Sequence, residues 1–60
     1  MLYKVFFENN NPIGAKTITT GTVGHIETRE ENGRKIFKWM IVEAGSQQDA
    51  LIKAKAATDK

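Results

Sequence analysis

An Asn-Gly pair at Asn32 and Gly33 lies between two runs of β-forming residues, and it constrains the fold more than any other feature of the chain. Asn and Gly both accept positive φ, so this pair is the strongest short-range signal for a two-residue β-hairpin turn. Such a turn places Glu31 opposite Arg34 and fixes the alignment of the residues on either side. The sequence therefore predicts two antiparallel strands joined at this turn.

Three segments have the composition of strands. Residues 2–7 contain Tyr, Val and two Phe, and residues 17–29 and 34–44 are rich in residues that favour pleated sheet. Residues 8–14 combine three Asn with Pro and Gly, a composition typical of a turn or flexible loop. Gly21 and Gly24 interrupt the second strand, which is therefore expected to be bulged or bent.

Residues 46–58 are predicted to form the single helix. Ser46 is a good N-cap residue, and Asp49 three positions later completes a capping-box-like pattern. Asp49 also precedes Lys53 by four residues, an ion-pair spacing that adds about 0.2–0.5 kcal/mol. The apolar stripe is mostly alanine and consists of Ala50, Leu51, Ala54 and Ala57. Sheet residues can pack closely against so shallow a surface.

These elements predict an α+β fold, a three-stranded antiparallel meander with one C-terminal helix packed on one face (βββα). The 60 residues fit a single domain, residues 1–60, which buries only about 60% of the surface of its unfolded chain. The chain has no cysteine, so neither a disulfide nor a thiolate zinc site stabilises it. With no long apolar segment and no signal peptide at residues 1–11, we expect a cytoplasmic protein that does not enter a membrane.

The faces of the strands follow from the hairpin register and from two lysines. Lys4 and Lys38 alternate with apolar neighbours, and a lysine beneath the helix is a costly buried charge. The odd-numbered side of the first and third strands is therefore expected to face the helix. The predicted core consists of Tyr3, Val5, Phe7, Phe37, Trp39 and Ile41, with Leu51 and the helix alanines. A longer turn with a bulge is the alternative, since it shifts the middle strand by one residue and exchanges its faces.

The opposite side of the sheet is then apolar in part as well. It is expected to expose Leu2, Phe6, Ile36, Met40 and Val42 beside Lys4, Arg29 and Lys38. A mixed apolar and basic face on so small a protein is a candidate interface. Three occupants fit it: the loop at residues 9–16 folded back over the sheet, a second copy of the chain, or a foreign partner.

No set of residues has the spacing of a catalytic or metal site. His25 is the only histidine; it shares a strand face with Glu27, but no nucleophile with a flanking motif and no ligand cluster accompanies the pair. Glu30 and Glu31 lie at the hairpin tip, where solvent keeps a carboxylate pair from acid–base work. We therefore expect no enzyme activity, no cofactor, no metal and no small-molecule substrate.

Basic residues gather around the hairpin, at Arg29, Arg34, Lys35 and Lys38. They favour contact with a phosphate backbone, unless Glu27, Glu30 and Glu31 neutralise them across the strands. The net charge of +2 and the pI near 9.2 permit an acidic partner without requiring one. The aromatic side chains Tyr3, Phe37 and Trp39 could likewise be a base-stacking platform, but the small size of the chain favours their place in the core.

Residues 42–50, Val-Glu-Ala-Gly-Ser-Gln-Gln-Asp-Ala, form a strand–cap–helix junction that resembles the C-terminal part of many very short phage-encoded accessory proteins. The same segment is similar to the last strand and helix of double-stranded-RNA-binding domains. This chain has no counterpart of that family's first helix, and Gln47 and Gln48 stand where the family has phosphate-binding lysines. The βββα order is similar to that of phage-integrase arm-binding domains, which bind DNA through their sheet. These resemblances imply an accessory protein in the first case and contact with nucleic acid in the other two.

The sequence thus predicts a non-enzymatic binding module, a phage-type accessory protein that docks through its sheet on a host protein or on a second copy of itself. The expected contact residues are Phe6, Arg29, Lys38, Met40 and Val42. The alternative is a nucleic-acid-binding domain that uses the basic residues around the hairpin.

Overall fold

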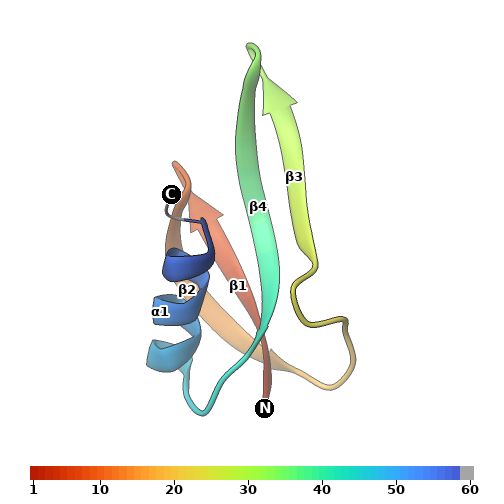
Figure 1. Cartoon of the computed structure of the whole chain (residues 1–60), viewed down its shortest axis with the longest axis vertical. Helices are drawn as coiled ribbons and strands as arrows, with labels where there is room; N and C mark the ends of the chain where they lie inside the picture. Colours follow the sequence, from red (N-terminus) through yellow and green to blue (C-terminus); the bar gives the residue numbers. More distant parts are fainter. Residues whose placement is uncertain (59–60) are drawn as a thin grey trace.

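A computed structural model describes residues 1–58 of the chain (Figure 1). Its strands are β1 (Leu2–Glu8), β2 (Asn11–Ile18), β3 (Ile26–Glu31) and β4 (Arg34–Glu43), and they are followed by the helix α1 (Gln47–Thr58). The strands form one antiparallel sheet in the order β2-β1-β4-β3. The predicted α+β class, antiparallel sheet and C-terminal helix are confirmed, but the sheet has four strands where three were expected.

The additional strand is β2, which follows β1 through a tight turn. Asn9 and Asn10 have φ values of 53° and 63°, and the turn pairs Glu8 with Asn11. Asn adopts this left-handed conformation more readily than most residues, so two consecutive Asn can form a two-residue hairpin turn. The turn predicted within residues 8–14 is confirmed at Asn9 and Asn10, but residues 11–14 belong to a strand and not to a loop. This is possible because β2 is an edge strand, where Pro12 needs no partner for its missing N–H group.

The single strand expected at residues 17–29 is divided in two. Thr17 and Ile18 end β2, residues 19–25 connect the two opposite edges of the sheet, and β3 begins at Ile26. Figure 1 shows this connection passing the end of the sheet where the chain begins. The meander order is therefore wrong: β1 and β4, from the two ends of the chain, are the central strands.

The hydrophobic core lies between the sheet and α1. Its buried members are Tyr3, Val5, Phe7, Met40, Val42, Ala44, Ala50 and Ala54, with Ala15, Phe37 and Leu51 packed against them. Ala50 and Ala54 are fully buried on the helix, so the backbone of α1 approaches the sheet closely, as the alanine stripe predicted. Figure 1 shows α1 beside β1 and β2, whereas the far end of the β3–β4 hairpin extends beyond it.

Met40 and Val42 correct the predicted faces of β4. Both residues are only 6% exposed, because they pair with Val5 and Tyr3 and share their helix-facing side. Trp39 and Ile41 therefore point away from the helix, contrary to the prediction. The cause is a bulge in β4: Trp39 pairs with Glu27 but Phe37 pairs with Thr28, so Lys38 has no opposite residue. In a regular strand, an odd-numbered and an even-numbered residue lie on opposite faces. The bulge shifts this alternation by one residue, so Phe37 and Met40 lie on the same face.

The local signals at the hairpin and at the helix start are confirmed. Glu31 pairs with Arg34 across the turn, in which Asn32 and Gly33 have φ values of 53° and 78°. The Asp49 N–H donates to Ser46 Oγ at 3.1 Å, and the Asp49 carboxylate lies 3.4 Å from Lys53 Nζ. Because of the bulge, Ile26 pairs with Met40, one residue further along β4 than in a regular two-residue hairpin.

Candidate interaction surface

The sheet has one face that α1 does not cover, which we call the open face. The strand register and the alternation of side chains define its residues. They include Lys16 and Ile18 of β2, Leu2, Lys4 and Phe6 of β1, Ile36, Trp39, Ile41 and Glu43 of β4, and Glu27, Arg29 and Glu31 of β3. The open face therefore combines aromatic, aliphatic and charged side chains, as expected for the uncovered side, but its membership differs from the prediction.

The connection between β2 and β3 covers one end of the open face. A Cβ atom built on Gly21 would lie 2.8 Å from Ile41 Cδ1 and 3.1 Å from Ile18 Cδ1, so the backbone here packs directly on these two side chains. The Gly24 N–H donates to the Ile41 carbonyl at 2.8 Å and fixes the end of the connection. The covering segment is thus residues 19–25, whereas the loop expected to fold back, residues 9–16, mostly forms strand β2.

The middle of the open face is built around Trp39. This residue pairs with Phe6 of β1, and both side chains are half-buried. Lys4 Nζ lies 4.4 Å from the centroid of the Trp39 ring, and the His25 ring lies 5.2 Å from it at an interplanar angle of 41°. A cation at this distance from an indole gains about 0.5–1 kcal/mol at an exposed site. Trp39 is therefore flanked by Lys4 and His25 but is not sealed from solvent.

Positive charge on the open face is concentrated on β1 and β2. Lys4 pairs with Lys16 in the strand register, so two like charges occupy neighbouring positions, an arrangement that lowers stability, and the Lys4 ammonium is turned toward Trp39 of β4. Within residues 1–58 neither lysine forms an ion pair. On the β3 side, acidic and basic groups alternate: Glu31 lies 3.5 Å from Arg29, and Glu27 lies 3.5 Å from the His25 ring, which carries a charge only when it is protonated. The cationic strip formed by Lys4 and Lys16 thus lies beside a strip of mixed charge.

A hollow of about 370 Å³ lies where β1 stops pairing with β4. It is lined by residues 7–9 at the end of β1, residues 36–38 of β4, and Arg29 and Glu31 of β3. The Asn10 side chain spans the gap: its amide donates to the Lys35 carbonyl at 3.2 Å and its oxygen accepts from the Phe37 N–H at 2.9 Å. This amide joins the β1–β2 turn to β4 where no strand pairing is left to do so.

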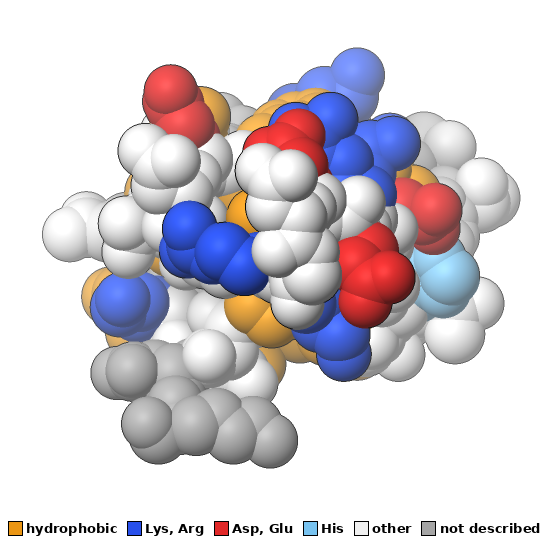
Figure 2. All heavy atoms as spheres, turned by 90° about the horizontal axis from the view of Figure 1, so that it is seen from above, with side chains coloured by type: hydrophobic (Ala, Val, Ile, Leu, Met, Phe, Trp, Pro, Cys, Tyr) orange, Lys and Arg blue, Asp and Glu red, His pale blue; other side chains and the backbone are white. Residues whose placement is uncertain are grey.

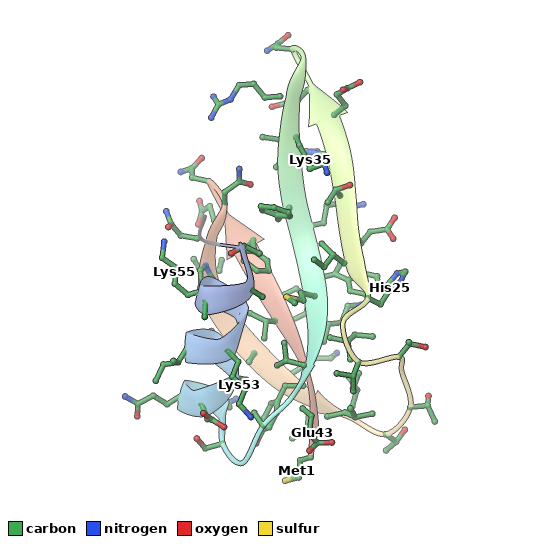
Figure 3. All side chains as sticks on the ribbon, in the orientation of Figure 1. Met1, His25, Lys35, Glu43, Lys53 and Lys55 are labelled. Carbon is green, nitrogen blue, oxygen red and sulfur yellow. The ribbon has the colours of Figure 1, made fainter. Side chains whose placement is uncertain are left out.

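The structure separates the predicted contact residues into three groups. Phe6 lies on the open face, and Arg29 and Lys38 come together at the hollow. Arg34 and Lys35 are exposed near the hairpin turn, and Figure 3 shows Lys35 and His25 toward opposite ends of this hairpin. Viewed from the hairpin end (Figure 2), basic and acidic side chains are intermingled, so the hairpin carries no uniform basic patch.

The third group, Met40 and Val42, is buried in the core and cannot contact a partner. Sequence reasoning missed Lys16 as a surface residue and favoured the core for Trp39. The signal for Lys16 is its alignment with Lys4, which becomes visible only once residues 11–18 are recognised as a strand. The position of Trp39 depends on the bulge at Lys38, which no local sequence motif predicts.

Residues 1–58 contain no group of three or more His, Cys, Asp or Glu that could hold a metal ion. No helix in that range is long and apolar enough to cross a membrane. Comparison of the chain with family models, curated proteins and solved structures found no match.

Proposed function

We propose that this protein is a non-enzymatic binding module that binds its partner on the open face. The observation that carries the proposal is the contrast between the two sides of one sheet: α1 covers one, while the other presents Phe6, Trp39 and two neighbouring lysines that form no ion pair within residues 1–58. Side chains that serve only stability do not require two lysines opposite each other. The small size and the strand–cap–helix junction support a role as a phage-type accessory protein that docks on a host protein or on a second copy of itself.

A host protein and a second copy of the chain remain candidate partners. The burial of Met40 and Val42 removes two aliphatic side chains from the surface expected for such docking, so its apolar part is smaller than the sequence predicted. Face-to-face pairing of two copies also brings together the lysines of both open faces. Self-association through this face is therefore less favourable than binding to a partner that carries negative charge.

Site-specific photo-crosslinking tests the location of the binding surface. A benzophenone amino acid replaces Phe6 on the open face in one variant and Ile52 in a control variant; Ile52 is 60% exposed on α1. Both variants are expressed in the cells that naturally make the protein and are irradiated. We expect covalent adducts from position 6 and few from position 52, because only the open face has the features of a binding surface.

The chemical nature of the adducts distinguishes a host protein, a second copy and a nucleic acid. Equal adduct yields at the two positions would contradict the proposal, as would adducts at position 52 alone. Circular dichroism of both variants checks that the fold is intact before irradiation.

A further inference from the structure

We propose that the ligand of the open face is single-stranded nucleic acid, an inference that rests on the binding function proposed above. The first support is charge complementarity. Lys4 and Lys16 lie side by side without an ion pair in residues 1–58, whereas Glu27 and Glu31 are turned to His25 and Arg29. A phosphate near the lysine pair offsets their mutual repulsion, and the lysines release counterions condensed on the nucleic acid, a major source of affinity for nucleic acids.

The second support is a half-buried aromatic pair in contact with one of these lysines, since Lys4 Nζ lies 4.4 Å from the Trp39 ring centroid and 5.8 Å from that of Phe6. Phe6 pairs with Trp39 on one side and with Gly14 on the other. A Cβ atom built on Gly14 meets no heavy atom within 4 Å, so the space beside Phe6 is open. Aromatic side chains on an open sheet next to cations are the arrangement on which unpaired bases stack.

The third support is the shape of the surface. The cationic strip and the Phe6–Trp39 pair are neighbours on the open face, and the hollow lined by Arg29 and Lys38 lies beyond them, where β1 stops pairing with β4. A half-buried aromatic pair on a sheet reaches the faces of splayed bases but does not enter the groove of a duplex. The surface therefore favours a short single strand over double-stranded DNA or RNA.

Trp39 makes the proposal directly measurable, since it is the only tryptophan and lies on the proposed surface. Its emission is recorded while a short oligo(dT) or oligo(U) is added to the full chain at low salt. We expect quenching that saturates, because a base stacked near the indole changes its surroundings. With two phosphates contacted, raising the salt about fourfold lowers the affinity about sevenfold.

Three substitutions assign the contributions. Lys4→Gln and Lys16→Gln each weaken binding and reduce its dependence on salt. Phe6→Leu keeps an apolar side chain in the same place and lowers the affinity for oligonucleotides about fivefold or more, because it removes one stacking surface. Lys55→Gln on α1 is the matched control, since Figure 3 places Lys55 on the helix, and this change leaves binding unaltered.

The outcomes separate this inference from the proposed function. The inference is overturned if no oligonucleotide changes the Trp39 emission at low salt, or if Lys55→Gln weakens binding as much as Lys16→Gln. It is also overturned if a duplex, or a base-free polyanion such as polyphosphate, binds as tightly as the single strand. If these tests fail while position 6 still crosslinks to a protein or a second copy, the binding function stands with another partner. If position 6 yields no adduct either, both proposals fail.

Discussion

The two faces of the sheet are built from alternate residues of the same strands, yet their surroundings differ completely. On the helix-facing side, Val5 is fully buried and Met40 is 6% exposed beneath the alanines of α1. On the open face, Lys4 lies over Trp39, and a connection rather than a helix covers one end. Hydrophobic burial on the first side stabilises the fold, and the second side is available for a partner. Substitutions on the two faces should therefore affect different properties.

The largest effect is expected from a charge placed on the helix-facing side. Met40→Asp puts a carboxylate into the core without a partner, and the cost of several kcal/mol exceeds what so small a domain can lose. We expect the far-ultraviolet circular dichroism of this variant to be that of an unfolded chain at room temperature. Lys38→Asp, two residues away on the same strand but exposed, serves as the control and keeps a cooperative thermal transition. A cooperative transition of Met40→Asp at the wild-type temperature would contradict the placement of the two faces.

A smaller effect is expected at Asn10, whose side chain joins the β1–β2 turn to β4 at the hollow. Asn10→Ala removes two hydrogen bonds to the backbone of β4, each with a net value of about 1 kcal/mol. Asn9→Ala is the matched control, because Asn9 also has positive φ but its side chain makes no such bond. We expect Asn10→Ala to lose about 1–2 kcal/mol more than Asn9→Ala in urea unfolding. Equal losses would show that the turn conformation, and not the side-chain bridge, holds β4 here.

The covered end of the open face can be tested at Gly21. Gly21→Ala places a methyl group against Ile41 and Ile18, and we expect a loss of about 1 kcal/mol, since the ends of both side chains can shift. Gly45→Ala is the control, because nothing lies within 4 Å of its added methyl group. The measurement is again the free energy of unfolding in urea. A loss at Gly45 as large as at Gly21 would contradict the close packing of residues 19–25 on the sheet.

The smallest effect is expected from the cations of the open face. Lys16→Gln removes one member of a like-charged pair, so the free energy of unfolding should change by less than about 0.5 kcal/mol, or rise slightly. Urea unfolding at low and high salt checks this, since the repulsion between Lys4 and Lys16 weakens as salt is added. A clear loss of stability would show that Lys16 serves the fold rather than a partner.

Local signals were sufficient to predict the parts of the fold that depend on neighbouring residues. Asn32 and Gly33 gave the hairpin because both accept positive φ, and Ser46 with Asp49 gave the start of α1. The strand β2 was missed because Pro12 and Gly14 are read as loop residues unless the segment lies at a sheet edge. Whether a strand lies at the edge depends on the arrangement of the whole sheet, so the residues around Pro12 do not reveal it.

The candidate site was predictable only in part for the same reason. Phe6, Arg29 and Lys38 were identified from composition, and the structure leaves them accessible or at the hollow. Met40 and Val42 were misplaced because the bulge at Lys38 reverses the alternation of side chains in β4. One extra residue in β4 thus places Met40 in the core and Trp39 on the open face, the reverse of the prediction.

The accessibility and charge around Trp39 test the account of the open face most directly. Iodide and caesium are compared as quenchers of the emission of the free protein, since Lys4 lies 4.4 Å from the indole and attracts the anion. We expect iodide to quench well and caesium poorly, with the difference reduced in Lys4→Gln and unchanged on dilution. Weak quenching by both ions, rising as the protein is diluted, would show that a second copy covers the open face. Stronger quenching by caesium would contradict the cationic surface on which both proposals rest.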